Sequence, residues 1–474
     1  MADYEYDIGV IGGGAAGLTV TSGSAQLGAK TLLIEKEKVL GGDCLHFGCV
    51  PSKTLIKTAH VYHMMKTAEK YGLPRVSIPP VDFETVSNRI KSVISVIQKH
   101  DSEERFCNLG AKVEFGDPVF LDEHSVRLNG KTVSAKNWVI ATGSSPFVPP
   151  IKGLDKTSYI TNKDIFYMDH LPKSMIIIGG GPIGSEMGQA FNRLGTKVYI
   201  VDLGDQILAK EDKDMADTIK QVMESEGVLF YLNASVEAVK DVGYEKEVII
   251  KNNEGKSVTL KAETVMVAVG RTPNIHGLGL EGIDVKVNRA GIEVDKRLRT
   301  NHKHIYAAGD VAEYVDIARS TPWVNAIWPE AVNQGRIAGL NMAGRRVTYP
   351  GSLSRNVIRI FDLDIMAAGV VNPPQDALYR KLVFKNANKK LYRKLVFQGD
   401  YLVGMVMVNG IEQGGLLLAS QGPVSVQRER PRFASFPPEE KAKVISMSPS
   451  VRSGVSSVPL VNTVTYMPGW RAWR

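Results

Sequence analysis

The stretch that decides the fold is Tyr6-Asp7-Ile8-Gly9-Val10-Ile11-Gly12-Gly13-Gly14-Ala15-Ala16-Gly17. Its first half is an apolar run typical of a buried strand. Its second half carries the glycine pattern GxGxxG, followed by an Ala-rich helical pattern and a second strand that ends at Glu35. In such a unit the first glycine allows a tight turn, the second lets the backbone approach a pyrophosphate, and the third brings helix and strand together. The stretch therefore predicts a dinucleotide site built on Gly12, Gly14, Gly17 and Glu35.

A second copy of this pattern starts at Ser174. Gly179, Gly181 and Gly184 follow an apolar strand, and Asp202 ends the next strand. Glu35 and Asp202 each stand 18 residues after the last glycine of their unit, where a carboxylate can accept hydrogen bonds from a ribose. A lone GxGxxG can be an ordinary glycine-rich turn, but two copies with an acid at the same offset argue against that alternative. The chain should bind two dinucleotides.

The length of the chain suits several domains. Its 474 residues suggest about three of them, and its 43% hydrophobic content is enough for real cores. We expect an α/β fold with two Rossmann-like dinucleotide-binding domains and a small, mostly β, C-terminal α+β module. The expected boundaries are 1–155 with 286–345 for the first domain, 156–285 for the second, 346–420 for the module and 421–474 for an irregular basic tail.

Between the two units lies a stretch with two of the chain's three cysteines, Gly41-Gly42-Asp43-Cys44-Leu45-His46-Phe47-Gly48-Cys49-Val50-Pro51-Ser52-Lys53. A helix running from about Cys44 would put both sulfurs on one face, close enough for a disulfide after modest bending. The dipole at its N-terminus would lower a cysteine pKa and favour a nucleophilic thiolate. The alternative is two unrelated buried cysteines. The spacing alone does not decide between a redox pair and two unrelated cysteines, because C-x-x-C is the usual redox spacing and this pair has two more residues between its cysteines.

Composition and charge argue against other classes of protein. No apolar run approaches the ~20 residues that span a bilayer, and the acidic start lacks the regions of a signal peptide, so we expect a soluble, cytoplasmic protein. We expect no metal site, because no second cysteine or histidine pair stands at zinc spacing. Most of the net charge of +8 lies in residues 421–474, which hold eight Lys and Arg against three Glu. Without a basic stripe elsewhere, we expect no nucleic-acid partner.

Other segments add to this picture. The strand and turn at residues 138–146 have an echo at residues 265–273, and both lie downstream of a GxGxxG unit, which indicates a paired role. Helical patterns cover residues 53–71, 82–110 and 330–342. The hexapeptide at 379–384 recurs at 392–397, in a β-rich region. Cys107 falls in a helical pattern, where we expect a packed core cysteine.

Together these stretches resemble the flavoprotein disulfide reductases, the pyridine nucleotide-disulfide oxidoreductases that include dihydrolipoamide dehydrogenase, glutathione reductase and mercuric reductase. The resemblance covers about residues 5–345 and rests on GGxCxxxxCVPSK beside two GxGxxG units. It implies that the first unit holds FAD and the second the nicotinamide dinucleotide. The further cofactor-binding residues it implies are Asp310 on the ribityl chain, Ala141, Thr142 and Gly143 near the flavin, and Gly270 and Arg271 in the loop below the nicotinamide dinucleotide.

The resemblance also implies a mechanism. A hydride passes from the nicotinamide to the flavin, and electrons then reach the disulfide, with Cys49 facing the flavin and Cys44 exchanging with substrate. Lys53 would pair with Glu186 near the flavin, where the glutamate offsets the cost of burying the cation. The alternative is a solvated lysine and a helix-surface glutamate. Asp202 suits the 2′-hydroxyl of NAD and no arginine follows it, so we expect NADH to be preferred over NADPH.

The chain departs from this family in its C-terminal part. Members that act on dithiols take a His and a Glu from the C-terminal domain of the partner subunit, whereas all nine histidines here precede residue 305. Exchange with a small dithiol should therefore be slow. His46 is either a local base or, as we favour, a packing or surface residue. The module at 351–420 is more similar to the C-terminal part of rubredoxin reductase and nitrite reductase flavoproteins.

We therefore expect an FAD-containing oxidoreductase, a homodimer, in which Cys44 and Cys49 form a redox-active pair. Its acceptor would be a disulfide or another small-molecule or protein acceptor. The alternative is an electron-transfer or redox-sensing subunit that serves a quinone, a metal ion or a redox protein without turning over a dithiol.

Overall fold

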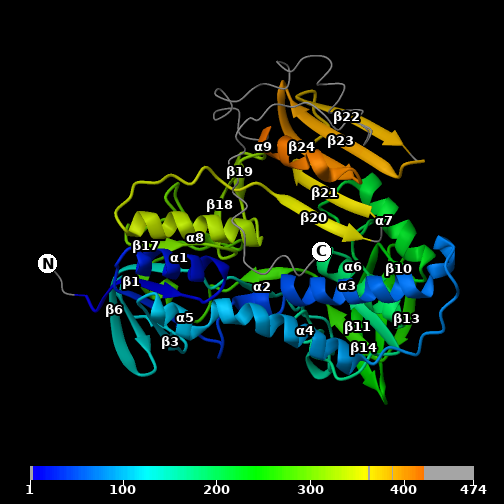
Figure 1. Ribbon diagram of the computed structural model, residues 1–474, viewed down its shortest axis with the longest axis horizontal. Coiled ribbons are helices and arrows are strands. Elements are labelled where there is room, and N and C mark those ends of the chain that lie inside the picture. The colour runs from blue at the N-terminus through cyan, green and yellow to red at the C-terminus, as the bar shows by residue number, and fades with distance from the viewer. Residues whose placement is uncertain (1–3, 361–362, 387, 421–474) are drawn as a thin grey trace.

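The computed structural model describes residues 4–360, 363–386 and 388–420, and the predicted tail at 421–474 lies outside them. Two α/β units, each with a parallel sheet, are followed by an antiparallel β module (Figure 1). The predicted fold class is thereby confirmed.

The first unit is built on a largely parallel sheet. Strands buried on both faces favour parallel pairing, and all five residues of the second strand are buried. The order is β3-β2-β1-β6-β5-β4, with β17 added in parallel to β6. The strands are β1 (Tyr6–Ile11), β2 (Thr31–Glu35), β3 (Ala111–Phe115), β4 (Val119–Phe120), β5 (Ser125–Leu128), β6 (Lys131–Ile140) and β17 (Ile305–Ala307).

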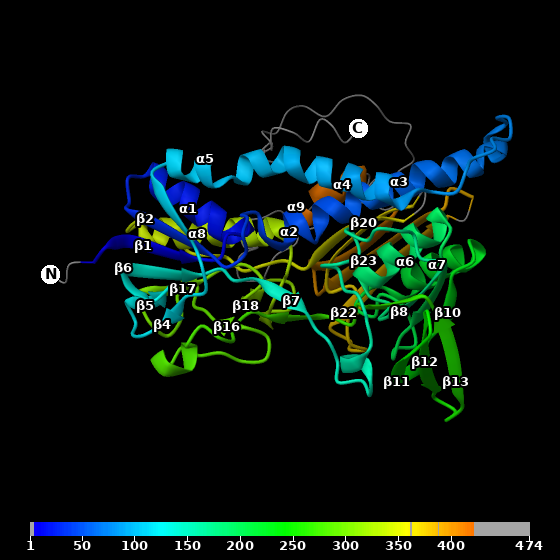
Figure 2. The ribbon, with the colours of Figure 1, turned by 90° about the horizontal axis from the view of Figure 1, so that it is seen from below.

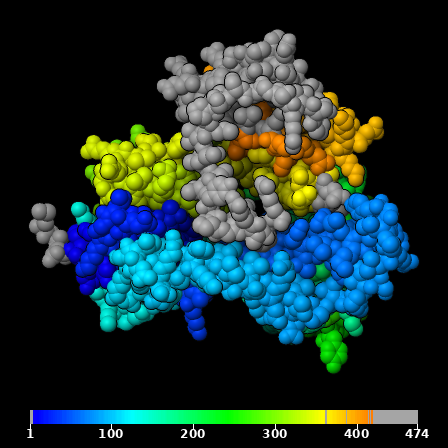
Figure 3. Space-filling view, in the orientation of Figure 1, coloured from blue at the N-terminus to red at the C-terminus, as the bar shows by residue number. Residues whose placement is uncertain are grey.

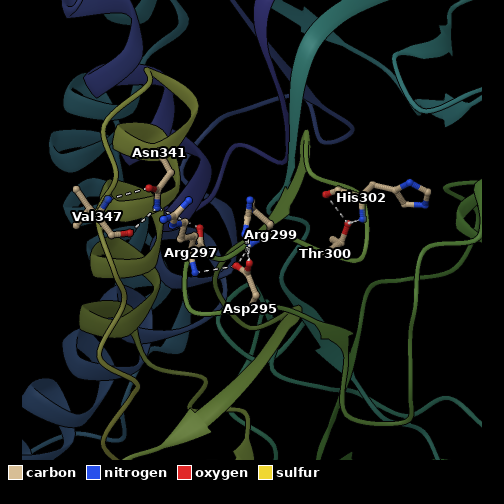
Figure 4. Close-up of polar contacts among 7 residues, drawn as sticks. All are labelled: Asp295, Arg297, Arg299, Thr300, His302, Asn341 and Val347. Atoms are coloured by element: carbon tan, nitrogen blue, oxygen red, sulfur yellow. Dashed lines mark hydrogen bonds and ion pairs between the residues drawn. The ribbon is translucent and has the colours of Figure 1, made fainter. Parts of the chain in front are cut away.

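Two helices pack against each other beside this sheet, α1 (Ala15–Gln26) and α8 (Trp328–Met342) (Figure 1). They approach closely, because a Cβ at Gly335 of α8 would overlap the backbone of Ala16 in α1. Asn341 at the end of α8 holds Val347 through two hydrogen bonds, and Asp295 caps the turn before β17 by accepting from the backbone of Arg297 and pairing with Arg299 (Figure 4). Residues far apart in the sequence thus complete the first unit.

The second unit repeats the parallel arrangement in the order β10-β9-β8-β14. A separate antiparallel sheet, β11-β12-β13, packs against it through a buried apolar cluster. The elements are β8 (Ser174–Ile178), α6 (Pro182–Leu194), β9 (Lys197–Val201), α7 (Lys213–Ser225), β10 (Leu229–Tyr231), β11 (Ala234–Val242), β12 (Glu245–Asn252), β13 (Ser257–Ala262) and β14 (Thr264–Val267).

Helices that follow the first βαβ unit reach across to the second one. Figure 2 shows α5, α4 and α3 in a row along the molecule, and in Figure 3 the same part of the chain, cyan to blue, covers much of the lower half of the visible face. The Phe83 ring of α4 lies 5.4 Å from that of Phe191 in α6, centroid to centroid, and both rings are buried. The cysteine stretch therefore lies at the junction of the two units. The helices are α2 (Gly42–His46), α3 (Cys49–Lys66), α4 (Phe83–Gln98) and α5 (Glu103–Asn108).

The two echoing segments of the sequence pair with each other. The strands β7 (Ser144–Pro146) and β15 (Arg271–Pro273) form an antiparallel ladder, with Arg271 opposite Pro146. The two segments are thus direct neighbours in the structure, while their paired role stays a prediction. A further small sheet holds β16 (Ile292–Glu293), β18 (Ala312–Asp316) and β19 (Thr321–Trp323), and single 3₁₀ turns are η1 (Ala68–Tyr71), η2 (Lys99–Asp101), η3 (Leu154–Lys156) and η4 (Leu280–Ile283).

The C-terminal module is a sheet in the order β20-β21-β24-β23-β22. The repeated hexapeptides form its β22–β23 hairpin, in which Leu382 lies opposite Leu395. Val396 in the inner copy is buried, whereas Val383 in the edge strand is half exposed. One face joins the apolar core around α7, and the other lies under α9. The elements are β20 (Arg355–Ile360), β21 (Leu363–Gly369), β22 (Tyr379–Asn386), β23 (Leu391–Gln398), β24 (Tyr401–Val408), η5 (Ile411–Gln413) and α9 (Gly414–Ser420).

The structure corrects two predictions. The helix expected from about Cys44 is broken, since α2 ends at His46 and α3 begins at Cys49. Gly48 makes the break possible, because a Cβ there would press on the Asp43 carbonyl at 3.0 Å. Cys107 is exposed rather than packed in the core. Its neighbour Phe106 takes the inward position on α5 and is only 1% exposed.

Candidate redox site

The glycines of the first unit form a turn that leaves its helix N-terminus open. Gly12 has a φ of +108°, and a Cβ there would overlap the Ala141 carbonyl. A Cβ at Gly17 would overlap the Gly12 carbonyl, so these two positions require glycine. At Gly14, the N-cap of α1, the nearest atom to a Cβ is the Gly42 Cα at 3.8 Å, and no side chain caps the helix. Unpaired N–H groups at such an end suit a phosphate.

The second unit repeats this geometry position by position. Gly179 also has a φ of +108°, and a Cβ at Gly184 would overlap the Gly179 carbonyl. A Cβ at Gly181, the N-cap of α6, meets nothing within 4 Å, and again no side chain caps the helix. Both turns therefore fit the pyrophosphate of a dinucleotide.

The two predicted acids act alike on their own glycine turns. Glu35 accepts hydrogen bonds from the Gly13 nitrogen at 2.6 Å and the Glu37 nitrogen at 2.9 Å. Asp202 accepts from the Gly180 nitrogen at 2.6 Å and the Gly204 nitrogen at 2.7 Å. In each case one carboxylate oxygen holds the turn and the other the residue two positions on. A carboxylate at this place can also receive ribose hydroxyls.

The residues expected around the flavin form one connected group. Asp310 accepts a hydrogen bond from the Ser144 hydroxyl at 2.8 Å, and burial raises the pKa of its carboxyl. Thr142 and Asn274 exchange two hydrogen bonds, which tie the Ala141–Gly143 turn to the segment after β15. Gln334 of α8 accepts from the Gly309 nitrogen at 2.8 Å and so fixes the turn that carries Asp310. Sequence reasoning missed Ser144, Asn274 and Gln334, because no local pattern marks them.

The structure brings Cys44 and Cys49 together from two helices. Cys44 lies in α2 and is partly buried, while Cys49 is the first residue of α3 and the more exposed sulfur. A hydrogen bond from the Cys44 thiol, helped by the charge of Lys53, lowers the pKa of Cys49 from 9.0 to about 7. The same contact and burial raise the pKa of Cys44 well above its usual value. Cys49 is therefore the sulfur that ionises first.

Lys53 and Glu186 pair as expected. The Lys53 Nζ lies 2.5 Å from the Glu186 Oε1, which joins α3 to α6 across the junction of the two units. The lysine side chain is 48% exposed and the glutamate 12%. The lysine is thus half exposed but paired, and the glutamate is largely buried rather than a helix-surface residue.

Other side chains hold the cysteine stretch in place. His46 directs its Nε2 to the Leu40 carbonyl at 2.9 Å, which fits the packing role favoured from the sequence. Asn162 donates to the Phe47 carbonyl at 2.9 Å, and the Tyr167 hydroxyl donates to the His46 carbonyl at 2.8 Å. Arg271, expected in the loop below the nicotinamide dinucleotide, lies 3.1 Å from the Asp43 carboxylate. Gly270 beside it has a φ of +145°, with open space at its Cβ position.

Two kinds of feature are lacking in the described part of the chain. Within it, no group of three or more His, Cys, Asp or Glu side chains is placed to hold a metal ion. Nor does any described helix combine the length and apolar character needed to cross a membrane.

Two families of known proteins match this chain, one over the two dinucleotide-binding units and one over the C-terminal module. The pyridine nucleotide-disulphide oxidoreductase family matches residues 6–335, and the rubredoxin NAD+ reductase C-terminal domain matches residues 355–419. A dihydrolipoyl dehydrogenase of Bacillus subtilis is 33% identical over 334 residues, which cover 66% of this chain and 69% of that protein.

Mercuric reductases are similar over a smaller share of their own length. The enzyme of Bacillus cereus is 31% identical over 355 residues, or 74% of this chain and 54% of that protein. That of Lysinibacillus sphaericus is 30% identical, with 61% of its length covered. This chain thus spans little more than half the length of the mercuric reductases it matches.

Proposed function

Because the chain belongs to the pyridine nucleotide-disulphide oxidoreductase family, whose members bind FAD and NAD(P)H, we propose that it uses NADH to reduce a disulfide between its own Cys44 and Cys49 and passes the electrons to an acceptor. The observation that carries this proposal is the setting of Cys49. Its sulfur stands at the N-terminus of α3, beside Cys44 and Lys53, at the junction of the two units that fit dinucleotides. A cysteine without a chemical role would not require a helix N-terminus, a second cysteine and a lysine beside its sulfur.

The reaction balances as a two-electron transfer. NADH gives up a hydride, the Cys44–Cys49 bond breaks, and two thiols form with one proton taken from solvent. FAD, when bound, supplies the chemistry that accepts a hydride and releases electron pairs. The residues that would hold it are Gly12, Gly14, Gly17, Glu35, Ala141, Thr142, Gly143 and Asp310.

The chain's own groups decide which sulfur carries the charge. Lys53 and the Cys44 thiol both favour the thiolate of Cys49, so Cys49 would be the sulfur that faces the flavin. Cys44, the sulfur with the raised pKa, would hold its proton until a base on the acceptor side removes it, and its thiolate would then exchange with the acceptor. Glu186 keeps Lys53 in place and offsets its charge.

We propose NADH as the preferred reductant. Gly179, Gly181 and Gly184 would bind its pyrophosphate, and the Asp202 carboxylate would receive the 2′-hydroxyl and repel a 2′-phosphate. Both oxygens of Asp202 already accept a backbone hydrogen bond, which holds the carboxylate in one orientation. The residue that follows, Leu203, is 76% exposed and offers no charge to a phosphate.

A protein acceptor is a second candidate for the oxidising half of the reaction. The C-terminal module matches the C-terminal domain of rubredoxin NAD+ reductase, a protein named for reducing or oxidising a redox protein. No histidine follows residue 304, so the chain lacks the usual base for a small dithiol. We therefore propose electron transfer to a redox protein as the second candidate function. We also propose that the chain is cytoplasmic and forms a homodimer.

Anaerobic reduction of the FAD-loaded protein with NADH tests the reductive half. Free thiols are counted before and after, in a Cys107→Ser background that removes the exposed third cysteine. We expect two new thiols per chain, none in Cys44→Ala or Cys49→Ala, and a long-wavelength thiolate-to-flavin absorption band. No gain in thiols, with acceptor turnover unchanged in both cysteine variants, would remove the pair from the mechanism. A screen of disulfides, quinones, metal ions and redox proteins then identifies the acceptor.

A further inference from the structure

Arg271 lies where two connecting segments meet the cysteine stretch. It begins β15, which pairs with β7, so the two segments that join the first unit to the second run side by side here. Its Nε donates to the Ser144 hydroxyl at 2.8 Å, and its Nη2 donates to the Ser144 carbonyl at 2.6 Å. The guanidinium is thus anchored on β7, and its Nη2 also reaches the Asp43 Oδ1 at 3.1 Å.

Asp43 receives a second partner from the same junction. The Asn162 side chain, which is 5% exposed, donates to the Phe47 carbonyl at 2.9 Å and approaches the Asp43 Oδ1 at 3.4 Å. Phe47 and Gly48 form the break between α2 and α3. Asn162 and Arg271 therefore hold both the beginning of α2 and its end, and with them the relative position of Cys44 and Cys49.

The charge of Asp43 opposes ionisation of the cysteines. Its carboxylate raises the pKa of both Cys44 and Cys49. A guanidinium 3.1 Å away offsets much of that negative charge, although both side chains are partly exposed and solvent weakens the effect. The other charged groups that act on Cys49 are Lys53 from α3 and Glu186 from α6.

We propose that Arg271 is a positioning residue of the redox pair: with Asn162 it fixes Asp43 and the break between α2 and α3, and its charge keeps the Asp43 carboxylate from suppressing the Cys49 thiolate. This role rests on the proposed function of the cysteine pair. It differs from a role in binding the nicotinamide dinucleotide, because each contact of the guanidinium given above is made on the side of Asp43 and β7. Two successive hydrogen bonds, from Arg271 to the Ser144 hydroxyl and from that hydroxyl to Asp310, also link the arginine to the residues expected around the flavin.

The test compares Arg271→Met, Arg271→Lys, Asp43→Asn and the double variant Arg271→Met/Asp43→Asn with the parent protein. The chain is reduced with dithiothreitol, and the pH midpoint for iodoacetamide alkylation of Cys49 is followed by peptide mass spectrometry. We expect Arg271→Met to raise the midpoint by about half a pH unit, which is roughly threefold in alkylation rate below the midpoint. Asp43→Asn should lower it, and the double variant should return toward the parent value.

Arg271→Lys should raise the midpoint less than Arg271→Met but still above the parent value, because a lysine keeps the positive charge but cannot contact Ser144 and Asp43 at once as the planar guanidinium does. The matched control is Arg299→Met, which removes an arginine paired with Asp295 at 2.5 Å outside the cysteine stretch (Figure 4). It should leave the midpoint unchanged. If Arg271→Met fails to fold, Asp43→Asn and the double variant still carry the comparison.

The proposal is overturned if Arg271→Met leaves the midpoint at the parent value, whether or not thermal stability falls or the KM for NADH rises. It is also overturned if Arg271→Met raises the midpoint as much in the Asp43→Asn background as in the parent, because the arginine would then act independently of Asp43. Failure of the proposed function is a separate observation, namely that NADH yields no new thiols in the parent protein. The alkylation midpoint is measured after chemical reduction and does not depend on that result.

Discussion

Replacing Cys44 should raise the pKa of Cys49, because the hydrogen bond from the Cys44 thiol is the largest influence that lowers it. All influences together lower the pKa of Cys49 from 9.0 to about 7. At pH 7 about half of the Cys49 sulfur is then ionised, against about 1% at the unperturbed value.

In Cys44→Ala the donor is gone, while burial still opposes the thiolate and Lys53 still favours it. We expect the alkylation midpoint of Cys49 to rise by at least about one pH unit, with a rate at pH 7 that falls about tenfold. Cys44→Ser is the matched control, because its hydroxyl can still donate to the sulfur, and its midpoint should stay within about half a unit of the parent.

The assay is iodoacetamide alkylation of the reduced protein between pH 5 and pH 10, read on the peptide that contains Cys49, with the exposed Cys107 as an internal reference. The sign follows from the chemistry: a lowered pKa means that reactivity is present above the midpoint and is lost as the pH falls through it. A midpoint in Cys44→Ala equal to that of the parent would refute the reasoning, since the hydrogen bond would then contribute nothing.

Three further changes probe the dinucleotide site and the module. Gly181→Ala should fold normally, because the residue has an ordinary φ of −67° and open space at its Cβ position, yet raise the KM for NADH about tenfold without lowering FAD content; an unchanged KM would contradict the assigned pyrophosphate site. The parent should show a kcat/KM for NADH at least about tenfold above that for NADPH, and Asp202→Asn should narrow the ratio because the repelling charge is lost; equal values in the parent would argue against NADH preference. Lys394→Met should lower the free energy of unfolding, measured in urea, by about 3–5 kcal/mol, because it leaves the buried Asp212 carboxylate without the ammonium group that lies 2.5 Å from it. Adding Asp212→Asn should recover much of this loss. Additive losses in the double variant would show that the two groups do not interact.

Much of the two dinucleotide sites could be predicted, because the residues that form each site lie close together in the sequence. Each glycine turn and its acid lie within one strand, helix and strand, so spacing alone places Gly12 near Glu35 and Gly179 near Asp202. The structure adds that each acid holds its own turn by two backbone hydrogen bonds. The break between α2 and α3 had a local signal that the helix prediction passed over, because Pro51 cannot lie inside a continuous helix from Cys44 but fits the first turn of α3, which begins at Cys49.

Cys107 shows a second limit of sequence reasoning. A cysteine in an amphipathic helix is usually buried, but which residue of α5 points inward depends on what the helix packs against. Here Phe106 fills the core and turns its neighbour outward. A one-residue rotation of the helix reverses such a prediction.

By themselves the motifs of the sequence determined the two dinucleotide folds and the position of the cysteine pair, because their spacing limits the geometry, and the resemblance to the flavoprotein disulfide reductases supplied the Lys53–Glu186 pair. Only the tertiary structure decided which groups surround that pair. Asp43, Asn162 and Arg271 are separated by more than a hundred residues from one to the next, and they meet because β7 and β15 bring both connecting segments to the same junction. Contacts between distant segments arise from the packing of whole units, and no local pattern of residues encodes them.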